Sequence, residues 1–198
     1  MLSRRALITS LACAAALTAA ACDPAPTPPT PPPSMSTSAA ASSSGTPGPS
    51  RPRELSLDGA DPCELLTPRQ RAELHVTGTG RPLEIKAFTA TGCTWNDIGV
   101  SHLVMPVLIE GIETWTGGTR PGRPARIEDV EGFPAFTVTL PDDPDRCDVV
   151  VDTADGQYLS TGFSVVSDTP QRHPQPCPRA IELARAVLRT LLAQTGPA

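Results

Sequence analysis

Apolar and polar residues alternate along the second half of the chain with the period of a β-strand. The ranges 135–140, 147–152 and 159–165 each place every second side chain on one apolar face, which predicts half-buried strands. Asp155-Gly156 lies between the last two ranges and predicts a tight hairpin. The period changes at 179–193, where Ile181, Ala184, Val187, Leu188, Leu191 and Leu192 form one stripe and Arg179, Glu182, Arg185 and Arg189 form the opposite face. This spacing predicts an amphipathic C-terminal helix.

Three further strands are predicted upstream, at 83–89, 93–97 and 102–109. Pro106 favours an edge position or a bulge for the third, because proline cannot donate to a sheet ladder. Before them, Asp61-Pro62-Cys63-Glu64 and Thr67-Pro68-Arg69-Gln70 each combine a capping residue, a proline and an acidic or amide side chain. These signals predict two short helices that end near His75. Together the elements predict an α+β domain with an antiparallel sheet, short N-terminal helices and a C-terminal amphipathic helix.

The first 21 residues form a separate pattern that predicts an export signal. Arg4 and Arg5 precede a short apolar run, and small residues lead up to Cys22. A cysteine at this place is the acceptor for diacylglyceryl and fatty acyl groups such as palmitate in bacterial lipoproteins. Ala19 stands where a lipobox usually has Leu or Val, so a plain secretory signal is the alternative. The apolar run is too short for a transmembrane helix.

Residues 22–53 are expected to form a disordered tether after the acylated cysteine. Ten prolines lie within 23–53, and Ser, Thr and Ala fill most of the other positions. Such a segment cannot bury enough apolar area to offset the entropy of ordering it. At about 3.1 Å per residue in polyproline II, it would reach at most about 95 Å from the membrane. The globular domain is therefore expected to span 54–198.

The charged residues indicate the kind of organism that the chain comes from and exclude some classes of binding partner. The chain has 15 Arg and a single Lys, Lys86, a bias typical of a high-GC genome, and an actinobacterium fits the acylated cysteine and the tether. From Glu54 onward, 12 basic residues face 20 acidic ones, which gives a net charge of about −8. This charge argues against nucleic acid or an anionic lipid surface as the direct partner of the domain.

The cysteines of the domain predict disulfides. An even number in an exported chain favours disulfides over metal ligands, although four cysteines allow three pairings. Cys63 and Cys93 are 30 residues apart, and so are Cys147 and Cys177. Each of these two pairs would join the start of a helix to a strand. The repeated spacing therefore favours Cys63–Cys93 and Cys147–Cys177.

Four short motifs resemble those of actinobacterial lipoproteins in the domain of unknown function 3558 family. They are Asp61-Pro62-Cys63-Glu64-Leu65-Leu66-Thr67, Gly92-Cys93-Thr94-Trp95, Gly132-Phe133-Pro134-Ala135 and Cys147-Asp148-Val149-Val150-Val151-Asp152. A cysteine at the start of the last helix, here Cys177, completes the match, although Pro176 stands where the family often has an acidic residue. The resemblance covers about 58–195. It implies a surface lipoprotein without an established activity, so it supplies no catalytic residues.

No motif predicts a cofactor, a metal or a catalytic site. His75, His102 and His173 lie in three different predicted environments and lack ligand spacing. Asp142, Asp143, Asp145 and Asp148 cluster, but the Gly and Glu of an EF-hand loop are missing, so a solvated acidic turn is expected. No Gly-x-Ser-x-Gly elbow is present.

The two tryptophans are the remaining candidates for a contact site. Trp95 follows a predicted disulfide cysteine and is expected in the core. Trp115 lies among glycines, so the 111–119 loop is a candidate contact region, with a buried lid over the sheet as the alternative.

These observations favour a non-enzymatic binding or accessory domain, anchored by lipid on the extracytoplasmic face of the cell membrane. An envelope protein, a cell-wall polymer and a small lipid are the candidate partners. A secreted hydrolase with an unrecognised site and a purely structural envelope protein are the alternative functions. The hydrolase predicts a polar cleft with a nucleophile and a base, whereas the binding domain predicts an apolar pocket or an exposed apolar patch.

Overall fold

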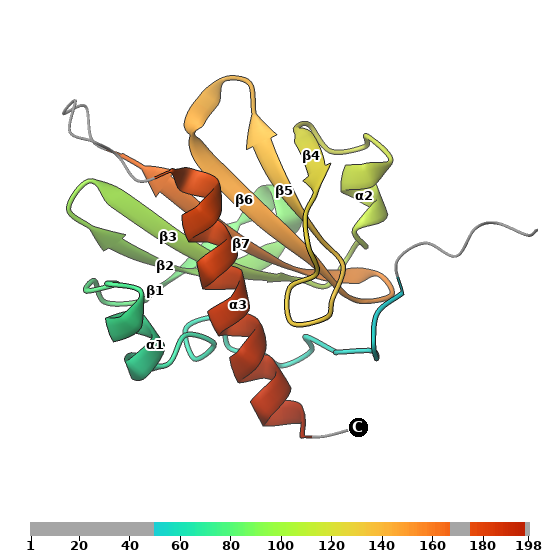
Figure 1. Cartoon of the computed structure of the whole chain (residues 1–198), viewed down its shortest axis with the longest axis horizontal. Coiled ribbons are helices and arrows are strands. Elements are labelled where there is room, and N and C mark those ends of the chain that lie inside the picture. The colour runs from blue at the N-terminus through green and yellow to red at the C-terminus, as the bar shows by residue number, and fades with distance from the viewer. Residues whose placement is uncertain (1–49, 167–174, 197–198) are drawn as a thin grey trace, which may run out of the picture. The chain divides into compact units, whose positions relative to one another are not determined.

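One antiparallel sheet organises the domain, as the sequence predicts (Figure 1). The computed structural model describes residues 50–166 and 175–196. Within these residues the sheet has seven strands in the order β1-β2-β3-β7-β6-β5-β4. The strands are β1 Arg81–Ile85, β2 Ala90–Asp97, β3 Val100–Val107, β4 Arg123–Arg126, β5 Ala135–Leu140, β6 Asp143–Ala154 and β7 Gln157–Val165. The helices are α1 Pro68–Glu73, η1 Lys86–Phe88, α2 Glu113–Thr116 and α3 Pro176–Thr195.

Two meanders meet in the middle of the sheet, where β3 pairs with β7. The register runs from Val100↔Val165 to Val107↔Tyr158. The β6–β7 hairpin turns at Asp155-Gly156, where Gly156 adopts φ 71°, a conformation that glycine reaches without strain. This hairpin confirms the turn that the sequence predicts.

Pro106 lies inside the sheet rather than on an edge strand, which corrects one expectation. β3 is flanked by β2 and β7. The β2–β3 ladder ends at Cys93↔Val104, so Pro106 has a strand partner, Leu159, on one side only. The proline is tolerated because the strand is locally an edge at that position.

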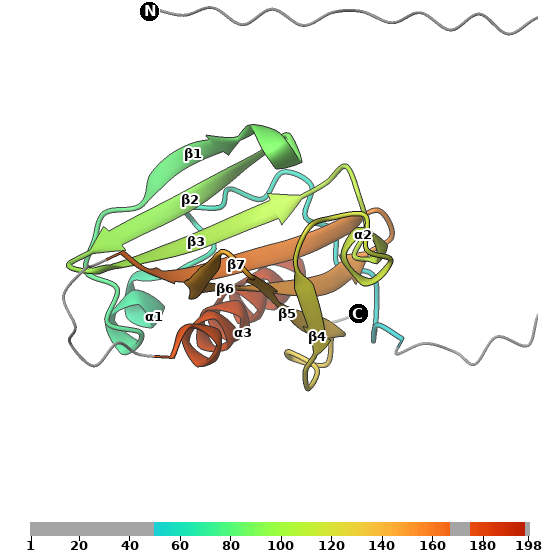
Figure 2. The same ribbon diagram turned by 90° about the horizontal axis from the view of Figure 1, so that it is seen from above.

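Helix α3 covers β6 and β7 on one face of the sheet, and α1 lies on the same side (Figure 2). The buried face of α3 includes Ala180 and Leu183, which the predicted stripe omits. Ile181 and Leu192, which the stripe includes, are only partly buried. The small Ala180 lies close enough to the sheet for its carbonyl to accept a hydrogen bond from Thr161 Oγ1 at 3.2 Å. Contact with the sheet therefore rotates the buried face from the position that the sequence pattern indicates.

Only one of the two predicted N-terminal helices forms. Thr67 and Gln70 make the expected capping box at the start of α1. At the other motif, Asp61 accepts a hydrogen bond from the Cys63 N–H at 2.8 Å, but the chain continues as turns. The two residues that follow, Leu65 and Leu66, are both buried in the α3 face of the domain.

Residues just before the expected domain boundary are bound to the domain. Arg51 pairs with Asp152 at 2.6 Å and with Asp155 at 2.5 Å. Leu55 donates a backbone hydrogen bond to the Thr153 carbonyl at 2.8 Å, and its side chain is buried. The packed domain therefore includes residues from about Arg51 onward.

Two apolar clusters lie on opposite faces of the sheet. The larger one, the α3 cluster, includes Trp95, Val149, Phe163 and the inner face of α3. The smaller one, the Trp115 cluster, consists of Met105, Val107, Trp115, Val138, Val150 and Tyr158. No helix within 50–166 and 175–196 is both long and apolar enough to cross a membrane.

Candidate binding surface

The connection between β1 and β2 carries a strained residue. Lys86–Phe88 form the short helix η1, and Thr89 follows with φ 45° and ψ 41°. This left-handed conformation is unfavourable for a β-branched residue, so the surrounding structure must hold it in place. The strand predicted at 83–89 therefore ends early, at Ile85.

Two hollows lie beside this turn and share Thr89, Ala90 and Thr91. The first has a volume of about 450 Å³ and is also lined by Glu84, Ile85 and Lys86. The second has a volume of about 280 Å³. It is also lined by residues of the N-terminal segment and of the end of β3, which are Leu57, Gly59, Ala60, Pro62, Pro106, Leu108 and Ile109. We call the two hollows together the hairpin-end surface.

The second hollow is bordered by exposed aliphatic side chains. Leu108 is 43% exposed and Ile109 is 60% exposed, and both follow directly after β3. A single exposed apolar residue is ordinary, but two consecutive ones at the mouth of an apolar hollow form an exposed apolar patch. The sequence pattern extends the strand to Ile109, so it gives no signal that these two side chains leave the sheet.

The first hollow differs because charged side chains line it. Lys86 is the single lysine of the chain, and Glu84 lies on the same hollow. The hairpin-end surface thus has an apolar part beside the end of β3 and a polar part beside β1.

Trp115 lies beneath this end of the sheet and is buried, with 6% of its surface exposed. Its ring stacks on Phe88 of η1, with 6.2 Å between centroids. The exposed contact role considered for Trp115 is therefore corrected in favour of the buried lid. Gly122, just beyond the 111–119 loop, lies against this ring, because a Cβ there would lie 2.8 Å from Val138 and 3.3 Å from the Trp115 ring. Glycine lets the backbone pack tightly against the tryptophan.

A polar network closes the Trp115 cluster. Glu110 Oε1 accepts hydrogen bonds from Arg120 Nε and from the Tyr158 hydroxyl, each at 2.7 Å. Burial, together with the Glu110 carboxylate, raises the pKa of Tyr158 above its usual value. The guanidinium of Arg120 also lies 4.0 Å from the centre of the Phe88 ring, a cation–π contact. This network fixes α2 and η1 against the sheet.

The four domain cysteines form the two disulfides that the sequence predicts. Cys63 bonds to Cys93 with 5.1 Å between Cα atoms, and Cys147 bonds to Cys177 with 5.0 Å. Cys22, the predicted lipidation site, lies outside the described residues.

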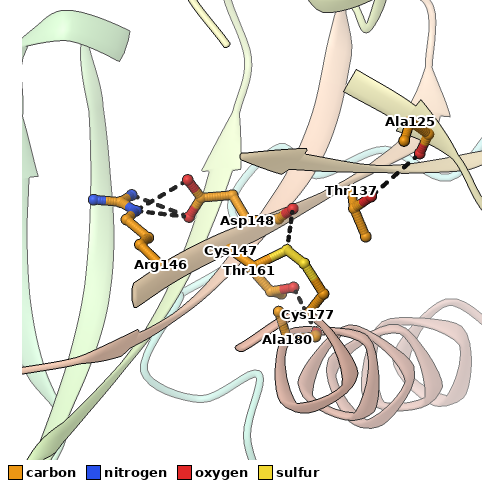
Figure 3. The surroundings of a disulfide bond; sticks show 8 residues. All are labelled: Ala125, Thr137, Arg146, Cys147, Asp148, Thr161, Cys177 and Ala180. Atoms are coloured by element: carbon orange, nitrogen blue, oxygen red, sulfur yellow. Dashed lines mark hydrogen bonds and ion pairs between the residues drawn. A yellow bond between two sulfur atoms is a disulfide. The ribbon is translucent and has the colours of Figure 1, made fainter. Parts of the chain in front are cut away.

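Asp148, which the sequence places in a solvated acidic turn, lies within β6. Its side chain is on the opposite face of the strand from the Cys147–Cys177 bond (Figure 3). Its carboxylate accepts hydrogen bonds from Arg146 at 3.0–3.2 Å. A Cβ at Gly162 would lie 2.5 Å from Asp148 Oδ1, so the carboxylate occupies space that glycine leaves free. Burial raises the pKa of Asp148, and Arg146 opposes that rise. This pair buries a charge on the sheet, which the sequence reasoning missed.

The histidines do not come together. His75 ends the α1 segment with φ 57°, His102 is buried in the sheet, and His173 lies outside the described residues. Within 50–166 and 175–196, no three His, Cys, Asp or Glu side chains are grouped in a way that would hold a metal ion.

Comparisons with known proteins identify a family and no closer relative. A search of curated proteins and a search of solved structures found no match. One family model matches residues 17–190, which is most of the chain. The protein therefore belongs to the family described as "Protein of unknown function (DUF3558)".

Proposed function

We propose that this protein is a lipid-anchored accessory domain of the bacterial cell envelope that binds a protein partner through the hairpin-end surface. The exposed pair Leu108 and Ile109 at the mouth of the second hollow carries the proposal. Aliphatic side chains in this position gain free energy when a partner removes them from water, at about 25 cal/mol per Å². The sheet and the Cys63–Cys93 bond, which adjoins Pro62 in the wall of the second hollow, hold the surface in shape before binding, which lowers the entropy cost of association.

The size of the second hollow favours a side chain of a partner over an enclosed lipid. Its volume of about 280 Å³ lies below the roughly 300–1,000 Å³ of pockets that enclose small ligands. An apolar side chain inserted into a shallow hollow is the usual anchor of a protein interface. The acidic domain also repels anionic lipid headgroups.

The interface is tested by photo-crosslinking from position 109 in intact cells of the source bacterium. A photoreactive amino acid at Ile109 should give one discrete protein adduct, and Leu108→Asp should abolish it. Ile98→Asp is the matched control, because Ile98 is fully exposed on the β2–β3 turn, away from the hollow. The adduct partner, identified by mass spectrometry and purified, should bind the Leu108→Asp variant at least about tenfold more weakly. An adduct that persists in Leu108→Asp, transfer of label to lipid, or no adduct would each refute the proposal.

The anchor is tested separately at Cys22. We propose that residues 1–21 are removed as a signal peptide and that Cys22 then carries the acyl chains on the extracytoplasmic face of the membrane. Cys22→Ala should abolish incorporation of a metabolic fatty-acid probe and release the protein from the membrane fraction. Undiminished label on the variant would refute lipidation without affecting the interface.

A further inference from the structure

A third hollow, apart from the hairpin-end surface, lies beside the Cys63–Cys93 disulfide. It has a volume of about 330 Å³, and its lining includes Glu64, Arg71, Gly80 and Trp95. These residues come from the N-terminal segment, α1, the loop before β1, and β2. Tertiary structure thus brings a cation, an anion and an indole around one cavity.

Trp95 lines this hollow, and its indole N–H takes part in no hydrogen bond among the described residues. Its side chain is 1% exposed, and the hydrogen bonds in this part of the sheet join Thr94, Asn96 and Ser101 without including the indole. An indole nitrogen can only donate, so it can pair only with an acceptor atom. An acceptor atom brought by a ligand would satisfy it.

Gly80 lets the backbone pass close to this donor. A Cβ at position 80 would lie 2.8 Å from Trp95 Nε1 and 3.0 Å from Cys93 Sγ. Gly80 is not among the glycines with positive φ, so the backbone does not require glycine here. Glycine matters here because any larger side chain would collide with the indole and displace it from the wall of the hollow.

The two charged side chains of the hollow are not paired with each other. None of the ion pairs within the described residues includes Arg71 or Glu64. A guanidinium beside an indole donor is suited to a carboxylate, which accepts several hydrogen bonds at once. The Glu64 carboxylate is suited to an ammonium group.

We propose that this hollow binds a small zwitterion, an amino acid or a short peptide with a free carboxylate and a free amine. Arg71 and the indole of Trp95 bind the carboxylate, and Glu64 binds the ammonium group. The volume accommodates a ligand of this size but not a folded partner. The site is independent of the proposed interface at Leu108 and Ile109.

The proposal is tested by NMR of the indole N–H signals, of which the chain has two. The full-length ¹⁵N-labelled chain in mild detergent is titrated with alanine and with dialanine, and with acetate and methylammonium as the separate halves. The Trp95 signal should shift saturably with alanine or dialanine and much less with either half. The buried Trp115 signal should remain in place.

Variants connect the shift to the named residues. Arg71→Gln and Glu64→Gln should each raise the dissociation constant about tenfold or more. Arg69→Gln is the matched control, because Arg69 lies on the same helix and is exposed. Gly80→Ala should abolish the shift. If this variant fails to fold, the dissociation constants of Arg71→Gln and Glu64→Gln still test the proposal. No shift of the Trp95 signal in the folded protein, or equal shifts in Arg71→Gln and wild type, would overturn the proposal.

Discussion

The two faces of the sheet are held together by different means. The α3 face contains the larger apolar cluster, and both disulfides join the sheet to segments that pack on this side. The Trp115 face has no disulfide within the described residues. Its smaller cluster depends on one large aromatic side chain and on the Glu110–Arg120–Tyr158 network. Covalent closure thus supports one face, and packing with buried polar contacts supports the other.

The difference between the faces corresponds to the positions of the candidate sites. The third hollow lies beside the Cys63–Cys93 bond, so the wall at Cys63 is linked covalently to the sheet. The hairpin-end surface is supported by the noncovalent contact between Phe88 and Trp115, and only the wall at Pro62 adjoins a disulfide-bonded residue, Cys63. We therefore expect that damage to the Trp115 face disturbs the hairpin-end surface first.

Loss of Trp115 should have the largest effect on stability. Trp115→Ala should lower the free energy of unfolding by about 3–5 kcal/mol, because it opens a cavity in the smaller cluster. Trp115→Phe should cost less than half as much, since a smaller ring still fills part of the space. Urea unfolding of both variants measures the two values. A loss below about 1 kcal/mol for the alanine variant would show that the ring is not packed as described.

Removal of one disulfide should have the next largest effect. Cys147→Ala combined with Cys177→Ala should cost about 3–4 kcal/mol in the loop-entropy model, because the bond closes a 30-residue loop. Hydrogen exchange should increase in α3 and remain nearly unchanged in α2. Equal increases on both faces would contradict separate stabilisation. Peptide mapping without reduction should find the same two pairings in the wild-type protein.

The polar network on the Trp115 face should contribute less. Glu110→Gln keeps an oxygen acceptor but removes the charge opposite Arg120, so we expect a loss of about 1–2 kcal/mol. The pair is partly exposed, which keeps the effect at the lower end. Glu113→Gln on the exposed side of α2 is the matched control and should have almost no effect. Similar losses in the two variants, measured by thermal unfolding, would remove any special role for Glu110.

His102 on the α3 face should have the smallest effect on stability. The effect should appear as a dependence of the free energy of unfolding on pH. Burial lowers its pKa, Asp97 partly opposes this, and Arg179 adds to the lowering. Its Nδ1 has no hydrogen-bond partner among the described residues. Below pH about 6.5 the unfolded chain therefore binds more protons than the folded protein, and stability falls as pH falls.

Between pH 6.5 and 5.5 this group can account for at most about 1.4 kcal/mol. His102→Gln should remove that slope in urea unfolding, whereas His75→Gln, at an exposed position, should retain it. An unchanged acid slope in His102→Gln would assign the pH dependence to other groups.

Local sequence signals predicted most of the elements correctly. The alternation at 147–152 and 159–165 and the Asp155-Gly156 turn gave the central hairpin, because strand period and turn chemistry are properties of neighbouring residues. The equal cysteine spacings gave both disulfides. The errors arose where distant contacts decide. Asp61 caps a turn that does not become a helix, and the leucines after it, Leu65 and Leu66, pack into the core.

The candidate sites could not be predicted in the same way. Trp115 and the glycines beside it indicate either a mobile anchor or tight packing, and only the stacking on Phe88 and the burial of Trp115 in one cluster with Val138 distinguish the two. Leu108 and Ile109 continue a strand pattern in the sequence, and the end of β3 at Val107 is what exposes them.

The sequence by itself determined the class of fold, the central hairpin, the C-terminal helix and the cysteine pairs, because each depends on period, turn residues or spacing along the chain. The tertiary structure alone decided which side chains are buried and which of them meet around a hollow. Arg71 and Trp95 come from different elements and line one cavity only after folding. Contacts of this kind depend on sheet order and helix rotation, which the free energy of the whole domain sets.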